Sequence, residues 1–370
     1  MLRLCVRIAL YALAIAFIAA AAWMDGGWWV RHVVVPACYL PPPAWMLPTV
    51  RGSLAAVGLA FGAVALIVRR LSAAELGRVG LAIVAALCVV EIALRVMERP
   101  ADRARHPRLE FLLGSKDART GWSFVPGRVM RFGQPGGGPV VEYAVDAHGD
   151  RAPSAGFVED PHAPTLLVTG ESMATGHGLE WRDTFAAQAG ARLGLQVVNV
   201  AEGGYGSDQA FLRACEALLR LRHPVALVST VLPVQLHRNL SDARPHLELR
   251  DGELVLAPAF WPRIRLRELF VDDLQILPEW RLQSSLRLTR AILEATARAA
   301  RDRGARPLFV LPLFTAEPEP VRELLAGLPH VVVELQPERI MPWDGHPDPR
   351  GAGQIADAIV SALQSSEAVR

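Results

Sequence analysis

Two short motifs contain residue types that could perform nucleophilic catalysis. In GESMATGHG, Ser172 follows an apolar run and lies on a turn rich in glycine. In DGHPDPRGAG, His346 follows Asp344 closely. A serine hydroxyl becomes a nucleophile when a histidine accepts its proton and an acid orients that histidine. The sequence therefore predicts Ser172 as nucleophile, His346 as base and Asp344 as the orienting acid. On these stretches alone, a helix-capping role for Ser172 and a surface location for His346 stay open.

Two further features of the sequence support an active site formed by these residues. NVAEGGYGSDQ contains Gly203, Gly204 and Gly206, whose bare backbone can offer N–H groups to an oxyanion. Asp348 and Pro349 form a favourable N-cap and first-position pair. The last helix should therefore begin directly after His346 and hold that histidine on a defined turn.

The elements between these motifs must bring them together. From Pro164 onward, β-type runs alternate with helical patterns. This alternation is typical of a mostly parallel sheet covered by helices on both faces, with ligand sites outside the carboxyl ends of the strands. We expect a three-layer α/β/α fold with five strands. The predicted strands are 165–169, 196–200, 225–232, 307–311 and 330–335, and the predicted helices are 184–193, 208–221, 286–303, 321–326 and 352–363.

The helical pattern is interrupted at about 236–283. HLELRDGELVL reads as a β-hairpin turning at Asp251 and Gly252, and a Trp- and Arg-rich stretch follows it. We interpret this insertion as a lid or specificity element over the strand ends. Before the α/β pattern, residues 101–163 form a loop-rich connector with one predicted half-buried edge strand at 140–145. The predicted domains are thus 1–100, 101–163 and 164–370.

The first hundred residues predict a membrane anchor. Apolar spans at 8–24, 54–68 and 79–96 indicate about three transmembrane helices. Glu91 and Arg95 lie one helical turn apart in the third span and should pair. The Trp- and Pro-rich stretch 26–48 favours an interfacial loop, because consecutive prolines remove backbone donors.

Two groups of arginines predict opposite orientations of the anchor in the membrane. Three spans, with arginines before the first and between the second and third, place the large domain outside the cytoplasm. A second arginine group, which directly follows the third span, opposes this orientation. The first group is Arg3, Arg7, Arg69, Arg70 and Arg78, and the second is Arg99, Arg103, Arg105 and Arg108.

At this point the sequence resembles the SGNH (GDSL-type) hydrolases, in particular their bacterial membrane-anchored branch, over about residues 117–365. GESMATGHG, NVAEGGYGSDQ and DGHPDPRGAG match three motif blocks of that family, with Glu171 in place of the usual Asp. DARTGWSFVPG and VDAHGDR resemble elements that precede its catalytic domain. The resemblance implies a flavodoxin-like sheet, Ser172 as nucleophile, Gly204 as the oxyanion-hole glycine and no cofactor. Because this branch is bacterial, we expect an inner-membrane protein, and the orientation that the first arginine group predicts would place its catalytic domain in the periplasm.

Another block departs from the family pattern. The family has an Asn just after the third strand, where its amide completes the oxyanion hole. Here STVLPVQLHRN places Pro233 and Val234 in that neighbourhood, and neither side chain donates a hydrogen bond. Gln235 or Asn239 is the available substitute. The family's acid often lies three residues before the histidine, a position held here by Trp343.

Three functions are therefore compatible with the sequence. The first is an esterase acting on an acylated small molecule, carbohydrate or lipid of the cell envelope. The second is an O-acyltransferase of the same chemistry, which would need a membrane partner to deliver acyl groups. The third is a non-catalytic binding module that has lost the third-block amide.

Other functional classes lack support in the sequence. The net charge of +2 gives no basis for nucleic-acid binding. Neither GxGxxG nor a P-loop motif occurs, so no nucleotide fingerprint is present. His177 with Glu171 could suggest a metal site, but no third spaced ligand accompanies them. The four cysteines form neither a disulfide framework nor a CxxC metal site.

Overall fold

The computed structural model describes residues 2–34, 45–68, 70, 72–97, 114–133, 138–259, 277–314, 319–343 and 345–365. Two compact units are present: a helical unit up to Asp102 and an α/β unit that begins at Arg103. Each unit is described by itself.

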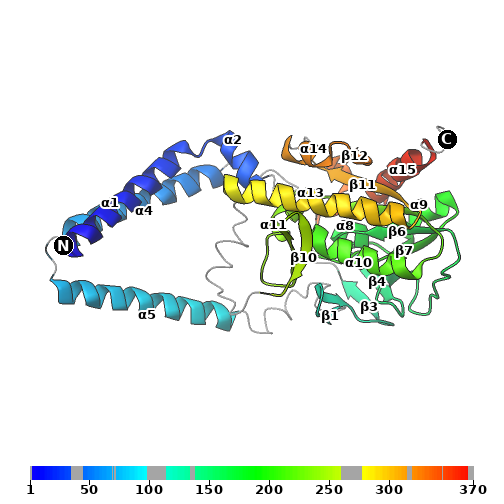
Figure 1. The fold of residues 1–370 in the computed structure, drawn as a ribbon, viewed down its shortest axis with the longest axis horizontal. Helices are drawn as coiled ribbons and strands as arrows, with labels where there is room; N and C mark the ends of the chain where they lie inside the picture. Colours follow the sequence, from blue (N-terminus) through cyan, green and yellow to red (C-terminus); the bar gives the residue numbers. More distant parts are fainter. Residues whose placement is uncertain are drawn as a thin grey trace. The chain divides into compact units, whose positions relative to one another are not determined.

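The N-terminal unit contains three helices that are long and apolar enough to cross a membrane (Figure 1). They confirm the three predicted spans but are longer, because helical structure continues beyond each apolar segment. Between the first two lie a short helix and a π-helical turn, and residues 35–44 of the expected interfacial loop lie outside the described residues. The elements are α1 (Leu2–Trp23), α2 (Gly26–Trp29), η1 (Val30–Val34), α4 (Met46–Val68) and α5 (Ala73–Met97).

Helix α4 begins earlier than the sequence indicated, at Met46 instead of about residue 54. Pro48 is tolerated because it lies in the first turn, where backbone N–H groups have no intrahelical partner. The Arg51 Nε donates to the carbonyl of Ala21 in the last turn of α1, 2.8 Å away. A cation at a helix C-terminus is favourable there, because the exposed carbonyls carry partial negative charge.

Close packing and one internal ion pair stabilise these helices. A Cβ at Gly58 would lie 2.8 Å from the Ile18 Cγ1 and 2.9 Å from the Ala14 carbonyl oxygen, so glycine allows α4 to approach α1 closely. On α5, the Arg95 Nε and the Glu91 Oε1 are 2.6 Å apart, which confirms the predicted pair.

The α/β unit is built on one eight-stranded sheet in the order β12-β11-β8-β6-β7-β5-β4-β3. The pairs formed by its first five strands are all parallel. The predicted fold class is therefore confirmed. These parallel strands are β6 (Thr165–Thr169), β7 (Gln196–Asn199), β8 (Pro224–Thr230), β11 (Arg306–Leu313) and β12 (His330–Glu334).

Three antiparallel strands from the connector extend this sheet: β3 (Val129–Gly133), β4 (Val140–Val145) and β5 (Arg151–Ala152). The predicted strand 140–145 has the expected bounds, but it lies between β3 and β5 and is not an edge. The alternation that suggested an edge has another cause. Tyr143 and Val145 point into a small core with Phe124 and Phe132, while Glu142 is exposed. A separate hairpin, β1 (Gly114–Asp117) with β2 (Gly121–Phe124), precedes these strands.

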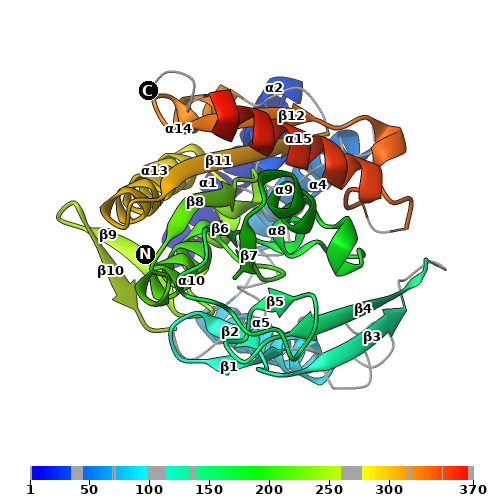
Figure 2. The same ribbon diagram turned by 90° about the vertical axis from the view of Figure 1, so that its right-hand side faces the viewer.

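Helices cover both faces of the sheet, which explains why β6 is buried along its whole length. Leu166 and Val168 pack against α9 (Phe185–Leu193) and α15 (Pro349–Ser365). Leu167 faces the opposite core, with α10 (Ser207–Arg220) and α13 (Glu279–Asp302). Figure 2 shows the two helical layers on either side of the strands. All five residues of β6 are buried, so this strand lies at the centre of the fold.

The predicted interruption of the helical pattern contains regular structure. β9 (His246–Arg250) and β10 (Glu253–Ala257) form the expected antiparallel hairpin. Asp251 and Gly252 both have positive φ, 52° and 87°, as a type I′ turn requires. Helix α11 (Val234–Arg238) precedes the hairpin, and α13 begins earlier than predicted, at Glu279. Residues 260–276, with most of the Trp- and Arg-rich stretch, lie outside the described residues. The remaining elements are α8 (Ser172–Thr175), η3 (Trp181–Asp183), α14 (Glu319–Leu325) and η5 (Pro337–Arg339).

Candidate active site

Ser172 is the first residue of the one-turn helix α8, directly beyond the carboxyl end of β6. The chain turns at Gly170, whose φ is +142°. A Cβ at Gly170 would lie 1.9 Å from the Thr230 Oγ1, so β6 and β8 approach too closely there for any side chain. Glu171 follows as the N-cap of α8, and its carboxylate accepts from the Met173 N–H. This turn presents the Ser172 hydroxyl at the sheet edge.

The Ser172 Oγ lies 2.8 Å from the Nε2 of His346. His346 is held from both sides by backbone contacts. Its carbonyl accepts from the Met341 N–H at 2.7 Å, and Ile340 bridges to Pro347. Helix α15 begins at Pro349, where the Asp348 Oδ1 accepts from the Gly351 N–H at 2.6 Å. The histidine therefore lies on a fixed turn, as the Asp-Pro pair predicts.

Asp344, the acid that the sequence suggested, lies outside the described residues. Its role as the residue that orients His346 stays a prediction. The preceding Trp343 is half-buried and packs against the core that α9 and α15 share.

A buried carboxylate is the second partner of the Ser172 hydroxyl. Glu171 is fully buried, and its Oε2 accepts from the Ser172 hydroxyl at 2.9 Å and from the Met173 N–H at 3.0 Å. Its Oε1 accepts from the Thr230 hydroxyl at 3.2 Å. The single Ser172 proton thus has two acceptors within reach, Glu171 and His346. Sequence reasoning considered Glu171 as a substitution for Asp and, with His177, as a possible metal ligand, and the signal it missed was the N-cap position before a one-turn helix.

Backbone donors suited to an oxyanion lie on neighbouring loops. Gly204 follows β7 with a φ of +79°. Its loop is tied to the Ser172 turn, because the Glu202 N–H donates to the Gly170 carbonyl at 3.3 Å. Among the described residues, the N–H groups of Ser172 and Gly204 have no recorded acceptor. Both groups are available to a ligand.

The two suggested substitutes for the third-block amide differ in their surroundings. The Asn239 Oδ1 accepts from the Ser207 N–H at 2.8 Å, and its Nδ2 donates to the Thr289 Oγ1 at 2.8 Å. Both ends of this amide are therefore engaged between α10 and α13. The Gln235 Oε1 accepts from the Leu232 N–H at 3.0 Å, while its buried Nε2 has no partner within the described part of the chain.

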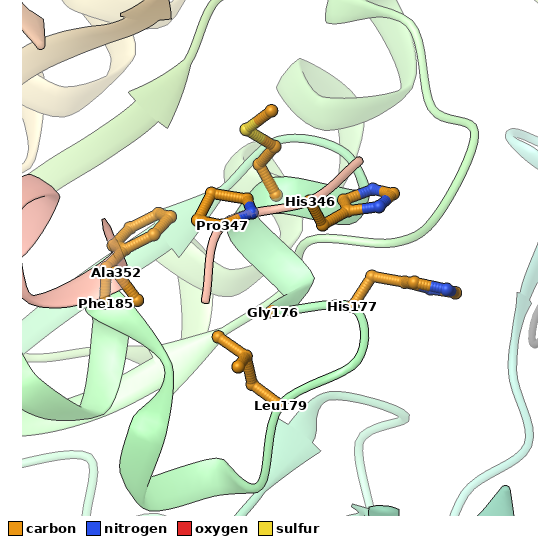
Figure 3. A pocket seen from close by; sticks show the side chains of 8 residues that line it. Gly176, His177, Leu179, Phe185, His346, Pro347 and Ala352 are labelled. Atoms are coloured by element: carbon orange, nitrogen blue, oxygen red, sulfur yellow. The ribbon is translucent and has the colours of Figure 1, made fainter. Parts of the chain in front are cut away.

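A second histidine lies against the first. The rings of His177 and His346 have centroids 4.7 Å apart and are inclined by 34°. Figure 3 shows the two side chains next to each other, one from the loop after α8 and one from the turn before α15. Sequence reasoning considered His177 only as a metal ligand.

A cavity of about 430 Å³ is lined by Gly178 and Leu179, which follow His177 in the chain, but neither histidine lines it. It shares Leu179 with the narrow space that His177 and His346 line. Its volume is in the range of small-ligand pockets, which are mainly apolar with a few polar groups. Lys and Arg are missing among its described lining residues, which include Leu179, Glu180, Asp183, Ile340, Met341 and Trp343.

Comparisons with known proteins give only distant similarities. No protein-family model matches this sequence, and no curated protein matches it. Among solved structures, the chain is similar to a G-D-S-L family protein from Desulfitobacterium hafniense, with 12% identity and a TM-score of 0.34, over 54% of this chain and 99% of that one. It is also similar to an acetyl xylan esterase from the rumen bacterium Butyrivibrio proteoclasticus, with 12% identity and a TM-score of 0.35, over 60% and 68% of the two chains. At this level of similarity the neighbours carry no argument about function, which must come from the site itself.

Proposed function

We propose that this protein is a membrane-anchored serine esterase that removes an acyl group from an alcohol through a covalent intermediate on Ser172. The observation that supports it most directly is the 2.8 Å contact between the Ser172 Oγ and the His346 Nε2 at the end of the central strand. A serine hydroxyl at this distance from an imidazole nitrogen has the base that nucleophilic attack requires.

In the proposed reaction, the Ser172 Oγ attacks the ester carbonyl carbon while its proton passes to the His346 Nε2. The tetrahedral intermediate collapses when the bond to the alcohol oxygen breaks, and His346 returns the proton to the departing alcohol. Water then attacks the acyl carbon while His346 accepts its proton. The bond from the acyl carbon to the Ser172 Oγ breaks, His346 returns the proton to this oxygen, and the free acid leaves. Asp344 is the proposed partner that orients His346 through these steps.

The negative charge of the intermediate would be held by the N–H groups of Ser172 and Gly204. Each such donor contributes about 10²–10³ in rate in comparable sites. Gln235 is the proposed third donor, because its Nε2 is buried without a partner among the described residues. Asn239 is a poorer candidate, since both ends of its amide are engaged by scaffold groups.

The cavity that Gly178 and Leu179 line is the proposed binding place of the part of the substrate that extends away from Ser172. Its apolar wall includes Met341 and Trp343, and carboxylates of Glu180 and Asp183 lie along it. Aromatic rings pack against apolar sugar faces and acyl chains, while carboxylates accept hydrogen bonds from hydroxyl groups. This lining favours a neutral hydroxylated or acylated substrate, such as an acylated carbohydrate or lipid of the envelope, over an anionic one.

A second candidate function is a non-catalytic binding module. It is favoured by the residues at the start of α11, because Pro233 and the buried Val234 offer no side-chain donor where an amide is expected. In this case the pocket would bind an acylated ligand without cleaving it.

Labelling with a fluorophosphonate probe separates the two candidates. Full-length protein in membranes should be labelled, since the probe traps a serine activated by a neighbouring base. The Ser172→Ala variant should lose the label, while Ser361→Ala, at an exposed position on α15, should keep it. Unlabelled wild type, or equal labelling of Ser172→Ala, would support the binding module instead.

The orientation of the anchor is part of the proposal. We propose that the α/β unit lies on the periplasmic side of an inner membrane. Three apolar helices support this orientation, together with Arg7 near the start of α1 and Arg70 between α4 and α5. Compartment-sensitive reporters fused after Arg70 and at the C-terminus should report opposite compartments, with the C-terminal one outside. A periplasmic signal at Arg70 with a cytoplasmic C-terminus would reverse the orientation. Equal signals from both fusions would reject a three-span topology.

A further inference from the structure

A buried arginine holds the loop that carries His177. The Arg151 Nη1 donates to the carbonyls of Thr175 and Gly176, at 2.7 Å each, and its Nη2 donates to the Leu179 carbonyl at 2.5 Å. These three carbonyls lie on both sides of His177. Arg151 is only 2% exposed, so its hydrogen bonds are shielded from water.

The surroundings of Arg151 are unusual for a buried cation. Burial lowers the pKa of its guanidinium below the usual value. Among the described residues no carboxylate forms an ion pair with it. The loop carbonyls accept its hydrogen bonds instead. The Tyr143 ring, whose centroid is 4.1 Å from the Arg151 Cζ, adds a cation–π contact. The Glu180 carboxylate and Tyr143 counter the lowering of its pKa in part. Burying a charge is costly unless hydrogen bonds compensate for the lost water, and the loop carbonyls provide such bonds here.

Tyr143 completes this arrangement. Its side chain is fully buried on β4, and its hydroxyl accepts from the Gly178 N–H at 2.5 Å. Arg151 and Tyr143, which we call the clamp, thus bind the backbone at four successive or near-successive positions from Thr175 to Leu179. Both clamp residues come from the antiparallel strands of the connector, ahead of the nucleophile in sequence.

The clamped loop has little freedom to move. Gly176 and Gly178 on either side of His177 have φ angles of +76° and +77°, a conformation that other residues adopt only at a cost. A Cβ at Gly176 would lie 2.3 Å from the Thr184 Cγ2, so the loop is packed tightly on α9. The His177 N–H donates to the Ser172 carbonyl at 2.9 Å. The position of His177 is therefore determined by its loop.

We propose that His177 is a positioning residue of the active site, whose ring packs on His346 and limits the rotation of the catalytic imidazole, and that the Arg151–Tyr143 clamp holds it there. The proposal rests on the catalytic role proposed above for His346. General-base catalysis depends on a fixed direction of the imidazole nitrogen, and a displacement of about 1 Å can cost about 10²-fold in rate.

The first test replaces the His177 ring. His177→Ala should reduce kcat by about 10- to 100-fold with little change in KM. His177→Phe keeps a flat ring without nitrogen atoms and should retain most of the wild-type kcat. Equal losses in both variants, or wild-type kcat in His177→Ala, would overturn the packing role. Melting temperatures of the full-length variants in detergent should stay close to wild type, because His177 is only half-buried.

The second test asks whether the clamp acts through His177. Arg151→Lys keeps the charge but lacks the planar fork that reaches both ends of the loop. Tyr143→Phe keeps the ring and removes the hydroxyl that accepts from the Gly178 N–H. Each should reduce kcat in the wild-type background and add little to the loss already present in His177→Ala. A purely structural clamp would lower kcat by the same factor in both backgrounds, and that additivity would overturn the proposal.

NMR spectroscopy can test the packing of His177 on His346 without any catalytic activity, and so independently of the proposed function. In NMR spectra of histidine-labelled full-length protein, the ring protons of His346 should shift in His177→Ala and much less in His177→Phe, because the neighbouring ring current is lost only in the first. An inactive wild type with this shift would refute the esterase but leave the packing intact. Unchanged His346 resonances in His177→Ala would refute the packing itself.

Discussion

Replacing His346 by Gln should lower kcat/KM for a short aryl ester by about 10²–10⁴-fold, the usual contribution of a general base. Glutamine can still donate a hydrogen bond to the Ser172 hydroxyl, but its amide cannot accept the proton that leaves during attack. In this variant the Ser172 hydroxyl would donate to its other neighbour, the Glu171 carboxylate 2.9 Å away. Initial rates of the purified full-length protein in detergent give the measurement.

The matched control is His223→Gln, at an exposed histidine just before β8. It should leave the rate unchanged, because only its backbone carbonyl takes part in a recorded contact, with the Thr165 N–H. If His346→Gln and His223→Gln hydrolyse the ester equally fast, His346 is not the base. Glu171 would then be the alternative acceptor of the Ser172 proton, since its carboxylate also contacts the Ser172 hydroxyl.

Much of the fold could be predicted because its signals are local. β6 is a run of five buried residues ended by a glycine, and such a run indicates a central parallel strand without any knowledge of its partners. The hairpin turn at Asp251 and Gly252 follows from the need for positive φ at both positions. The start of α15 after Asp348 follows in the same way from capping chemistry.

The antiparallel extension of the sheet was predicted only in part, because pairing between distant strands leaves little trace in sequence. β5 is two residues long, too short for any periodic pattern. Its Arg151 reads as an ordinary charged residue, and arginines are almost never fully buried unless paired. Only the three-dimensional structure reveals that its partners are carbonyls more than twenty residues away.

For the candidate site, residue type and strand order indicated which side chains could meet. Ser172 and His346, which are separated by 174 positions, form the contact that the motifs suggested. The sequence could not predict side-chain direction. The Asn239 amide is hydrogen-bonded between α10 and α13, and the Glu171 carboxylate accepts from the Ser172 hydroxyl. Such directions depend on packing in three dimensions.

The turn that carries Ser172 should be the position in the α/β unit that tolerates substitution least. We expect Gly170→Ala to destabilise it by about 3 kcal/mol or more, because two costs of about 1–3 kcal/mol each combine. One is backbone strain at a φ of +142°, and the other is the collision of the new Cβ with the Thr230 Oγ1 at 1.9 Å and the Ala174 Cβ at 2.9 Å. For a domain of this size, the melting temperature should fall by about 6–12 °C.

Three further proteins separate the backbone strain from the steric collision: Gly127→Ala, Thr230→Ala and the double variant with Gly170→Ala and Thr230→Ala. Gly127→Ala is the strain control, since Gly127 has a φ of +69° but nothing within 4 Å of its Cβ position, and it should cost only about 1–2 kcal/mol. Adding Gly170→Ala to a Thr230→Ala protein should cost less than adding it to wild type, because the closest colliding atom is then absent. Thermal melts of the full-length proteins in detergent give the melting temperatures of these three proteins and of Gly170→Ala relative to wild type. Equal melting temperatures for Gly170→Ala and Gly127→Ala would show that β6 and β8 lie farther apart at this turn, and the hydroxyl of Ser172 would then lack the rigid support on which its contact with His346 depends.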